Sequence, residues 1–241
     1  MTWEQVEAEA AAILAAAAGH ARVVGSTGIR MHCERARGAM DELSRPCKDL
    51  DLVVRSGART ALRDALEERG YVIDRDLLVA MEGRRFAFRH ADTGLDVDVF
   101  VDKLQFCHTL ELDGRWERHS TTLPVEDLLL QKLQVHEPTE TDVMDAAVVL
   151  ATHGVGSGDR ERIDAGYVAG VLASDWGFHR DATANLDRVA QAAPRLGLTV
   201  DVSQLKEAID GARKSMAWRM RARVGERMQW WEDVSEREET Y

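Results

Sequence analysis

Cysteine is scarce in this 241-residue chain, and what little there is forms no recognisable pattern. The three cysteines, Cys33, Cys47 and Cys107, are odd in number and include no CxxC pair. They argue against a disulfide framework and against a zinc site, and they favour a reducing compartment. We therefore expect a cytoplasmic protein.

Long apolar runs and an excess of positive charge are also missing. No stretch approaches the roughly 18 apolar residues of a membrane span, and the alanine-rich segment 8–18 is interrupted by Glu9 and is typical of a helix. The N-terminus lacks the basic region of a secretory signal. The net charge of −11 excludes a general affinity for nucleic acid, so such binding would need a local basic patch.

One such patch exists near the C-terminus. It is either a solvated helix face or a surface for RNA or an anionic substrate. Its members are Arg213, Lys214, Arg219, Arg221, Arg223 and Arg227.

Several familiar catalytic patterns are absent too. The chain contains no GxSxG, HExxH or Walker-type lysine motif. His32, His108 and His136 have no spacing that suits a metal or a catalytic triad, so we expect structural or surface roles for them.

The patterns that are present predict an α+β fold in two parts. Residues 1–120 alternate between segments with the two-residue period of strands and segments with the period of about 3.6 residues of helices. This alternation indicates a mixed sheet with flanking helices. Residues 121–241 have helical periodicity, with Pro124 at a first turn and Pro138 as a stop. The boundary is expected near residue 120. Strands are predicted at 22–25, 49–54, 71–73, 84–89, 95–101 and 106–112, and helices at 2–19, 26–33, 58–69, 125–137 and 141–153; residues 34–46 form a loop or a short helix, and one apolar stripe joins Leu205, Ile209, Ala212, Met216, Met220, Val224, Met228 and Trp231.

Paired carboxylates are the most informative feature. Side chains alternate along a strand, so Asp49 and Asp51 project from one face while Leu50 and Leu52 project from the other. Two adjacent carboxylates repel each other unless a hard cation lies between them. The alternative is a pair of solvated edge-strand residues.

A second strand, 95–101, repeats the alternation with Asp96 and Asp98. Both share one face, and we favour Asp98 as the functional carboxylate because it directly precedes the Val-Phe-Val end of the strand. Upstream, Val24-Gly25-Ser26 is a turn after which the free N–H groups of a helix can face an anion. Asp142 and Asp145, near a helix start, are expected to serve the helix dipole and cap rather than a metal.

Taken in order, these motifs resemble the nucleotidyltransferase fold superfamily, which includes polymerase-beta-like enzymes and aminoglycoside nucleotidyltransferases. The family pattern is matched by Val24-Gly25-Ser26, by Asp49-Leu50-Asp51-Leu52 and by Val97-Asp98-Val99, although the spacer 27–48 is longer than usual. The segments 122–134 and 142–145 are similar to the helical part of small bacterial members, including AbiEii-like toxins.

The resemblance implies a fold, a reaction and a site. Asp49 and Asp51 would bridge two Mg²⁺ ions, and Asp98 would bind the ion on the acceptor side and act as a candidate base. Gly25, Ser26 and Lys132 would contact the triphosphate, and Lys48 would screen the carboxylates; for Lys132, an ordinary exposed helix lysine is the competing interpretation.

The implied activity moves a nucleoside monophosphate from a nucleoside triphosphate such as ATP to an acceptor hydroxyl and releases pyrophosphate. The acceptor stays open between RNA or a tRNA end, a protein, and a small molecule such as an aminoglycoside. A toxin of this kind would have an antitoxin as protein partner. The competing hypothesis is a nucleotide- or partner-binding module that keeps the fold without turnover.

Overall fold

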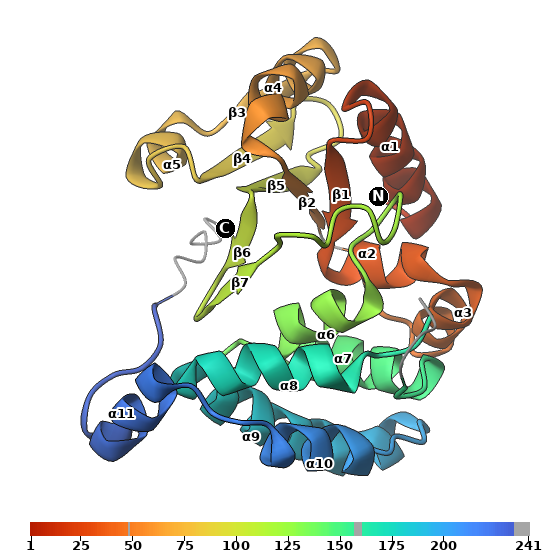
Figure 1. The fold of residues 1–241 in the computed structure, drawn as a ribbon. Helices are drawn as coiled ribbons and strands as arrows, with labels where there is room; N and C mark the ends of the chain where they lie inside the picture. Colours follow the sequence, from red (N-terminus) through yellow and green to blue (C-terminus); the bar gives the residue numbers. More distant parts are fainter. Residues whose placement is uncertain (48, 157–160, 234–241) are drawn as a thin grey trace.

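The computed structural model describes residues 1–47, 49–156 and 161–233. Over these ranges it contains eleven α-helices, a five-stranded mixed sheet and a separate two-stranded sheet, which confirms the predicted α+β class (Figure 1). The strands are β1 (Ala21–Val24), β2 (Asp49–Val54), β3 (Tyr71–Ile73), β4 (Arg85–His90), β5 (Asp96–Val101), β6 (Lys103–Gln105) and β7 (Thr109–Glu111). The helices are α1 (Trp3–Ala16), α2 (Gly25–His32), α3 (Glu34–Glu42), α4 (Arg59–Glu68), α5 (Arg75–Ala80), α6 (Val125–Leu133), α7 (Glu140–Thr152), α8 (Ala165–Ser174), α9 (Trp176–Ala192), α10 (Ser203–Gly211) and α11 (Met216–Val224).

The main sheet has the strand order β1-β2-β5-β4-β3. Its central pair, β2 and β5, is parallel, while the other neighbours are antiparallel. The expected antiparallel hairpin of β4 and β5 is present, and the bounds predicted for the strands 49–54 and 71–73 agree with the structure. The last predicted strand, 106–112, is shorter than expected and pairs with β6, which the sequence reading missed together with α5.

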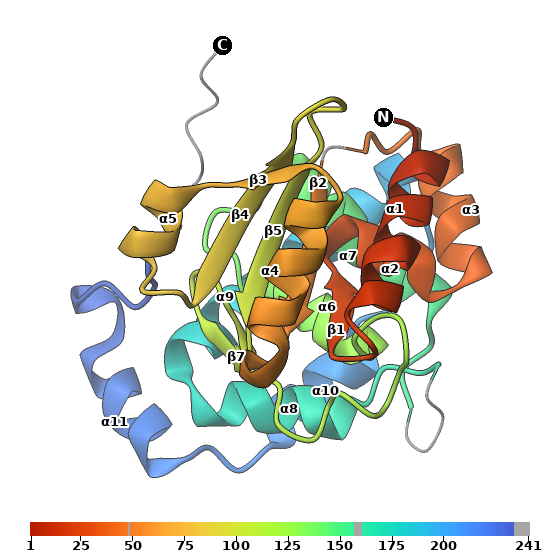
Figure 2. The same ribbon diagram turned by 90° about the horizontal axis from the view of Figure 1, so that it is seen from above.

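One face of the main sheet is covered by α1 and α4, as the view from above shows (Figure 2). Leu50, Leu52, Val97 and Val99 point into this layer and are buried. A capping box between Thr2 and Gln5 begins α1, as predicted. The residues that β2 and β5 place on this face are apolar, and the carboxylates of both strands lie on the opposite face.

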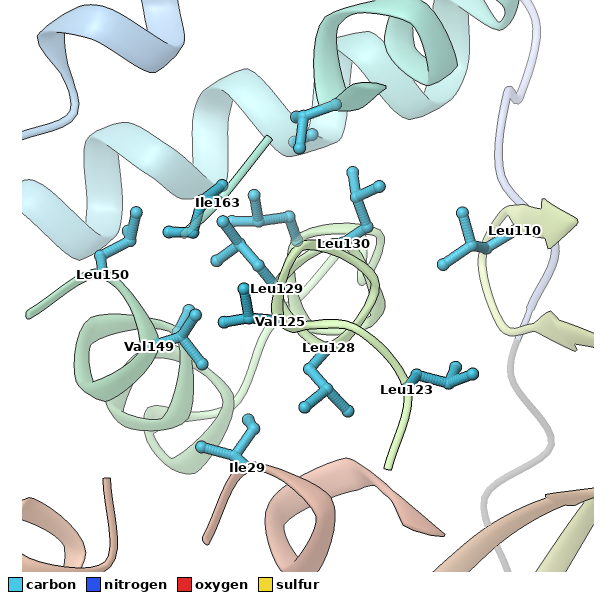
Figure 3. Close-up of a cluster of buried hydrophobic side chains, with 14 of the residues drawn as sticks. Ile29, Leu110, Leu123, Val125, Leu128, Leu129, Leu130, Val149, Leu150 and Ile163 are labelled. Carbon is cyan, nitrogen blue, oxygen red and sulfur yellow. The ribbon is translucent and has the colours of Figure 1, made fainter. Parts of the chain in front are cut away.

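The opposite face meets the helices of the C-terminal half. Its central element is α6, which is buried on almost every side and carries buried polar residues, Glu126, Asp127 and Gln131, beside its apolar ones. Figure 3 shows Leu128 and Leu129 of α6 in the same cluster as Ile29 of α2 and Val149 of α7. The same buried cluster includes Val53 and Phe100 of the sheet, so it takes residues from both sides of position 120.

The apolar stripe predicted along residues 205–231 is not one continuous helix. α10 ends at Gly211, and residues 212–215 separate it from α11. Leu205 and Ile209 are buried, but Met216, Met220 and Met228 are 70%, 62% and 65% exposed, so the prediction of core methionines was wrong. The apolar residues keep their helical spacing across the break between α10 and α11. The two helices are separate, so this spacing does not place the residues on one face.

Among the described residues, none of the helices combines the length and the apolar character that crossing a bilayer requires.

Candidate functional site

The four aspartates of β2 and β5 lie in register on one face of the sheet. Asp49 is opposite Asp96 and Asp51 is opposite Asp98 in the parallel ladder. Because alternate residues share a face, Val53 and Phe100 continue the same side and pack into the helical core. The carboxylates therefore lie at the edge of the interior, beside α2, which Figure 1 shows next to β1 and β2.

The two aspartates of β5 have different surroundings. Asp96 makes a two-pronged ion pair with Arg89, at 2.9 and 2.8 Å. Asp98 accepts one hydrogen bond through Oδ2 from Arg85 Nη2, at 3.0 Å. Its other oxygen, Oδ1, is buried and has no hydrogen-bond partner among the described residues. The structure thus places Asp98, rather than Asp96, beside Asp51 with a carboxylate oxygen still to be satisfied.

The surroundings of Asp51 disfavour the charged form of its carboxylate. Burial, followed by the negative charges of Asp49 and Asp98, raises its pKa well above the usual range for aspartate. Lys132 and Arg85 act in the other direction without cancelling the effect. Three carboxylates gathered in this way favour either a shared proton or a bound cation.

The turn between β1 and α2 is built around this group. Val24 pairs with Asp51 across the antiparallel ladder, which brings the next residue, Gly25, against the Asp51 side chain. Gly25 has φ +64°, and a Cβ at this position would lie 2.0 Å from Asp51 Oδ2. Its N–H donates to Gln131 Oε1 of α6 at 2.8 Å. Only glycine satisfies both the backbone conformation and the close approach.

Ser26 belongs to a buried polar network instead of pointing freely into the site. Its hydroxyl donates to Asp145 Oδ2 at 2.5 Å and accepts from Arg45 Nη2 at 2.6 Å. Arg45 Nε also donates to Asp145 Oδ1 at 3.0 Å. The hydroxyl is therefore held in place by two charged side chains.

Lys132 belongs to the same network. Its Nζ lies 3.0 Å from Asp142 Oδ1 and 3.0 Å from Asp145 Oδ2. Burial by itself would lower the pKa of Lys132, but Asp145 and Asp142 outweigh it and raise the pKa above the ordinary value. The ammonium group is thus largely buried and charged, which rules out the interpretation of an exposed helix lysine.

Of the two aspartates of α7, one has the expected capping role and the other belongs to the buried polar network. Asp142 forms a capping box with Thr139 at the start of α7, as predicted. Asp145 does not cap the helix; it is fully buried and receives Arg45, Lys132 and Ser26. Lys48, predicted to screen the carboxylates, lies outside the described residues.

Sequence reasoning missed three residues of this site, Arg45, Arg85 and Gln131, and expected a different role for Asp145. Arg85 carried a usable signal, since it lies on the strand that neighbours β5 in the predicted hairpin. Arg45 carried none, because its segment had no periodicity to place it.

Comparison with known proteins identifies no relative: no protein-family model, no curated protein and no solved structure matches this chain.

Proposed function

We propose that this protein is a magnesium-dependent nucleotidyltransferase, with the nucleotidyltransferase fold in its N-terminal half. The observation that carries the proposal is the group formed by Asp49, Asp51 and Asp98 on adjacent parallel strands, next to the Gly25–Ser26 turn at the start of α2. The order of these residues along the chain supports the same conclusion, although the spacer 27–48 is longer than the family pattern has.

The residues present fit a magnesium site by their chemistry. Mg²⁺ takes oxygen ligands, above all carboxylates and phosphates. The partnerless Oδ1 of Asp98 is an acceptor that a cation would satisfy. The raised pKa of Asp51 comes from burial and then from the charges of Asp49 and Asp98, and a cation would offset both effects.

Each residue then has a defined task. Magnesium, when bound, supplies charge neutralisation on the transferred phosphoryl group. Gly25 leaves room for a phosphate to approach the backbone of α2. Ser26 and Lys132 act through the network around Asp145, which holds the start of α2 rigid and places a positive charge behind the carboxylates.

The acceptor is a separate question. RNA, a protein hydroxyl and a small hydroxylated molecule remain the candidates, and an antitoxin-like partner remains a prediction. Part of the basic segment is engaged within the protein: Arg221 donates to the backbone oxygens of Gly225 and Met228. That leaves fewer cations on α11 for an RNA surface than the sequence suggested.

Calorimetric titration with ATP, GTP, CTP and UTP in the presence of Mg²⁺ tests the proposal. We expect the wild type to bind at least one nucleotide only with Mg²⁺, and Asp51→Asn to lose that binding. Asp96→Asn is the matched control, because its carboxylate is on the same face but is paired with Arg89. It should bind as the wild type does.

Two results would contradict the proposal in different ways. Absence of Mg²⁺-dependent nucleotide binding by folded wild type would remove the site itself. Binding without pyrophosphate release, across RNA, protein and aminoglycoside acceptors, would instead establish the non-catalytic nucleotide-binding module.

A further inference from the structure

A second cluster of metal-binding side chains lies at the other end of α2. His32 is the last residue of α2, His153 caps the C-terminus of α7, and Glu161 follows in the connection to α8. One ligand atom from each of the three lies within 4.8 Å of the other two. At about 1.5 Å of rise per residue, the eight residues of α2 separate this cluster from the Gly25 turn by roughly 12 Å.

The hydrogen bonds of His32 prepare its Nε2 for a ligand. Nδ1 lies 2.8 Å from Thr122 Oγ1, and that hydroxyl donates its own proton to the carbonyl oxygen of Leu123 at 2.9 Å. The same hydroxyl also lies 3.0 Å from His119 Nδ1. A proton on His32 Nδ1, donated to the hydroxyl, leaves the lone pair on Nε2. Nε2 is buried, has no hydrogen-bond partner among the described residues, and is 3.8 Å from Glu161 Oε2.

His153 is arranged in the same way. Its Nδ1 lies 2.8 Å from the backbone oxygen of Glu161, which can only accept, so Nδ1 carries the proton. Its Nε2 is 3.4 Å from Cys33 Sγ. The two imidazoles, each held through Nδ1 by an oxygen atom, reproduce the outer-shell support that metal-binding histidines usually have.

We propose that His32 Nε2, His153 Nε2 and the Glu161 carboxylate bind a zinc ion, with Cys33 Sγ in the fourth position. Imidazole nitrogen, carboxylate oxygen and thiolate sulfur are the ligands of tetrahedral zinc sites. Mg²⁺ is a poor competitor here because it takes oxygen ligands in octahedral geometry. The orphaned Nε2 distinguishes this cluster from histidines that are merely satisfied in a core.

The zinc ion would join two regions that are distant in sequence, residues 32–33 and residues 153–161. It would fix the C-terminal end of α2 to the end of α7 and to the connection that contains Glu161. Cys33 Sγ accepts from the Ala36 amide at 3.4 Å and lies 3.4 Å from His153 Nε2, so the sulfur is held beside the cluster.

Zinc titration of the full-length chain tests this assignment. We measure Zn²⁺ binding by calorimetry in saturating Mg²⁺, and expect one ion per chain. Glu161→Gln and His153→Gln should each weaken binding at least about tenfold, since even outer-shell changes have effects of this size. Glu161 is half-exposed, so its variant should fold even if a histidine variant does not.

Two controls separate this site from other zinc-binding groups. Glu226→Gln alters a glutamate of similar exposure outside the cluster and should leave zinc affinity unchanged. Asp51→Asn should also leave it unchanged, because the carboxylate group is at the other end of α2.

Cobalt substitution examines the ligands directly. A tetrahedral Co²⁺ spectrum with a sulfur charge-transfer band that disappears in Cys33→Ser would support the full ligand set; its absence would overturn the assignment of Cys33. Zinc affinity that is unaffected by both Glu161→Gln and His153→Gln, or that is lost in Asp51→Asn, would overturn the site.

Discussion

The two ends of α2 carry opposite ligand chemistries on one short helix. At its N-terminus, Asp49, Asp51 and Asp98 present carboxylate oxygens and mutual repulsion. At its C-terminus, His32 and His153 present imidazole nitrogens. The comparison teaches that the kind of ligand atom, more than the number of acidic groups, decides which ion each end suits.

Both ends take their positions from β1. Its pairing with β2 sets Gly25 against Asp51, which fixes the beginning of α2. On its other side, Val23 forms a parallel bridge with Thr122, the residue that holds His32 Nδ1. A four-residue strand therefore positions two groups of ligands, and a change at one end can be tested for its effect on the other.

The largest effect is expected from Gly25→Ala. A non-glycine residue in the left-handed region costs about 1–2 kcal/mol, and overpacking adds about 1–3 kcal/mol; here the added Cβ would lie 2.0 Å from Asp51 Oδ2. We expect chemical denaturation to show about 3 kcal/mol of lost stability, together with loss of Mg²⁺-dependent nucleotide binding.

Gly19→Ala is the matched control for this change. Gly19 has φ +81° but no atom within 4 Å of an added Cβ, so it should suffer only the backbone cost. Equal losses in the two variants would mean that the contact with Asp51 does not constrain the turn. Zinc affinity at the opposite end should be retained in any Gly25→Ala protein that folds.

Lys132→Met tests the network behind the carboxylates. The substitution removes the partner of Asp142 and one partner of Asp145, which is fully buried. Breaking a buried ion pair costs about 3 kcal/mol or more, measured as the change in free energy of unfolding. Lys206→Met is the control, since the Lys206–Asp187 pair is exposed and should contribute about 0–1 kcal/mol. A loss no larger than that of the control would show that Arg45 and Ser26 satisfy Asp145 without Lys132.

Much of the carboxylate end could be predicted from the sequence because its information is local. Alternation along 49–54 and 95–101 placed Asp49, Asp51 and Asp98 on one face, and the strand register agrees. The choice between Asp96 and Asp98 is visible only in the structure, where Arg89 and Arg85 occupy the neighbouring strand. Arg45 and Asp145 meet across 100 residues, and no spacing rule connects them.

The histidine end could not be predicted, because its residues are brought together only by the tertiary fold. Cys33 and His153 are 120 positions apart, and His32 and Thr122 are 90 apart. Metal motifs are recognised in sequence when ligands repeat at short, fixed intervals. The scarcity of cysteine argued against zinc, yet two histidines, a glutamate and one cysteine need no CxxC pair to form such a cluster.

Asp51→Asn should stabilise the metal-free protein at neutral pH while it removes function. The pKa of Asp51 is raised in the folded state above the ordinary value of 3.8, so the folded state holds its proton longer than the unfolded state does. The wild type therefore loses stability as pH rises from about 3.8 through the raised pKa. Thermal unfolding across this range should show a flatter dependence in Asp51→Asn, and added Mg²⁺ should restore stability to the wild type only. A variant less stable than the wild type at neutral pH would argue against carboxylate repulsion.

The histidine end should respond to pH with the opposite sign. Burial, followed by the neighbouring His119 and His153, lowers the pKa of His32 from 6.5 to about 3. Between these pH values His32 is protonated in the unfolded chain and neutral in the folded protein. Stability therefore falls as pH decreases from 6.5 towards 3. His32→Gln should flatten this part of the stability curve, whereas His20→Gln, at an exposed position, should leave it unchanged. Zn²⁺ should steepen the wild-type curve, because protons and metal compete for the same nitrogen. If His32→Gln keeps the wild-type slope, the acid sensitivity arises elsewhere, and the contrast between the two ends of α2 would then rest on their ligand atoms alone.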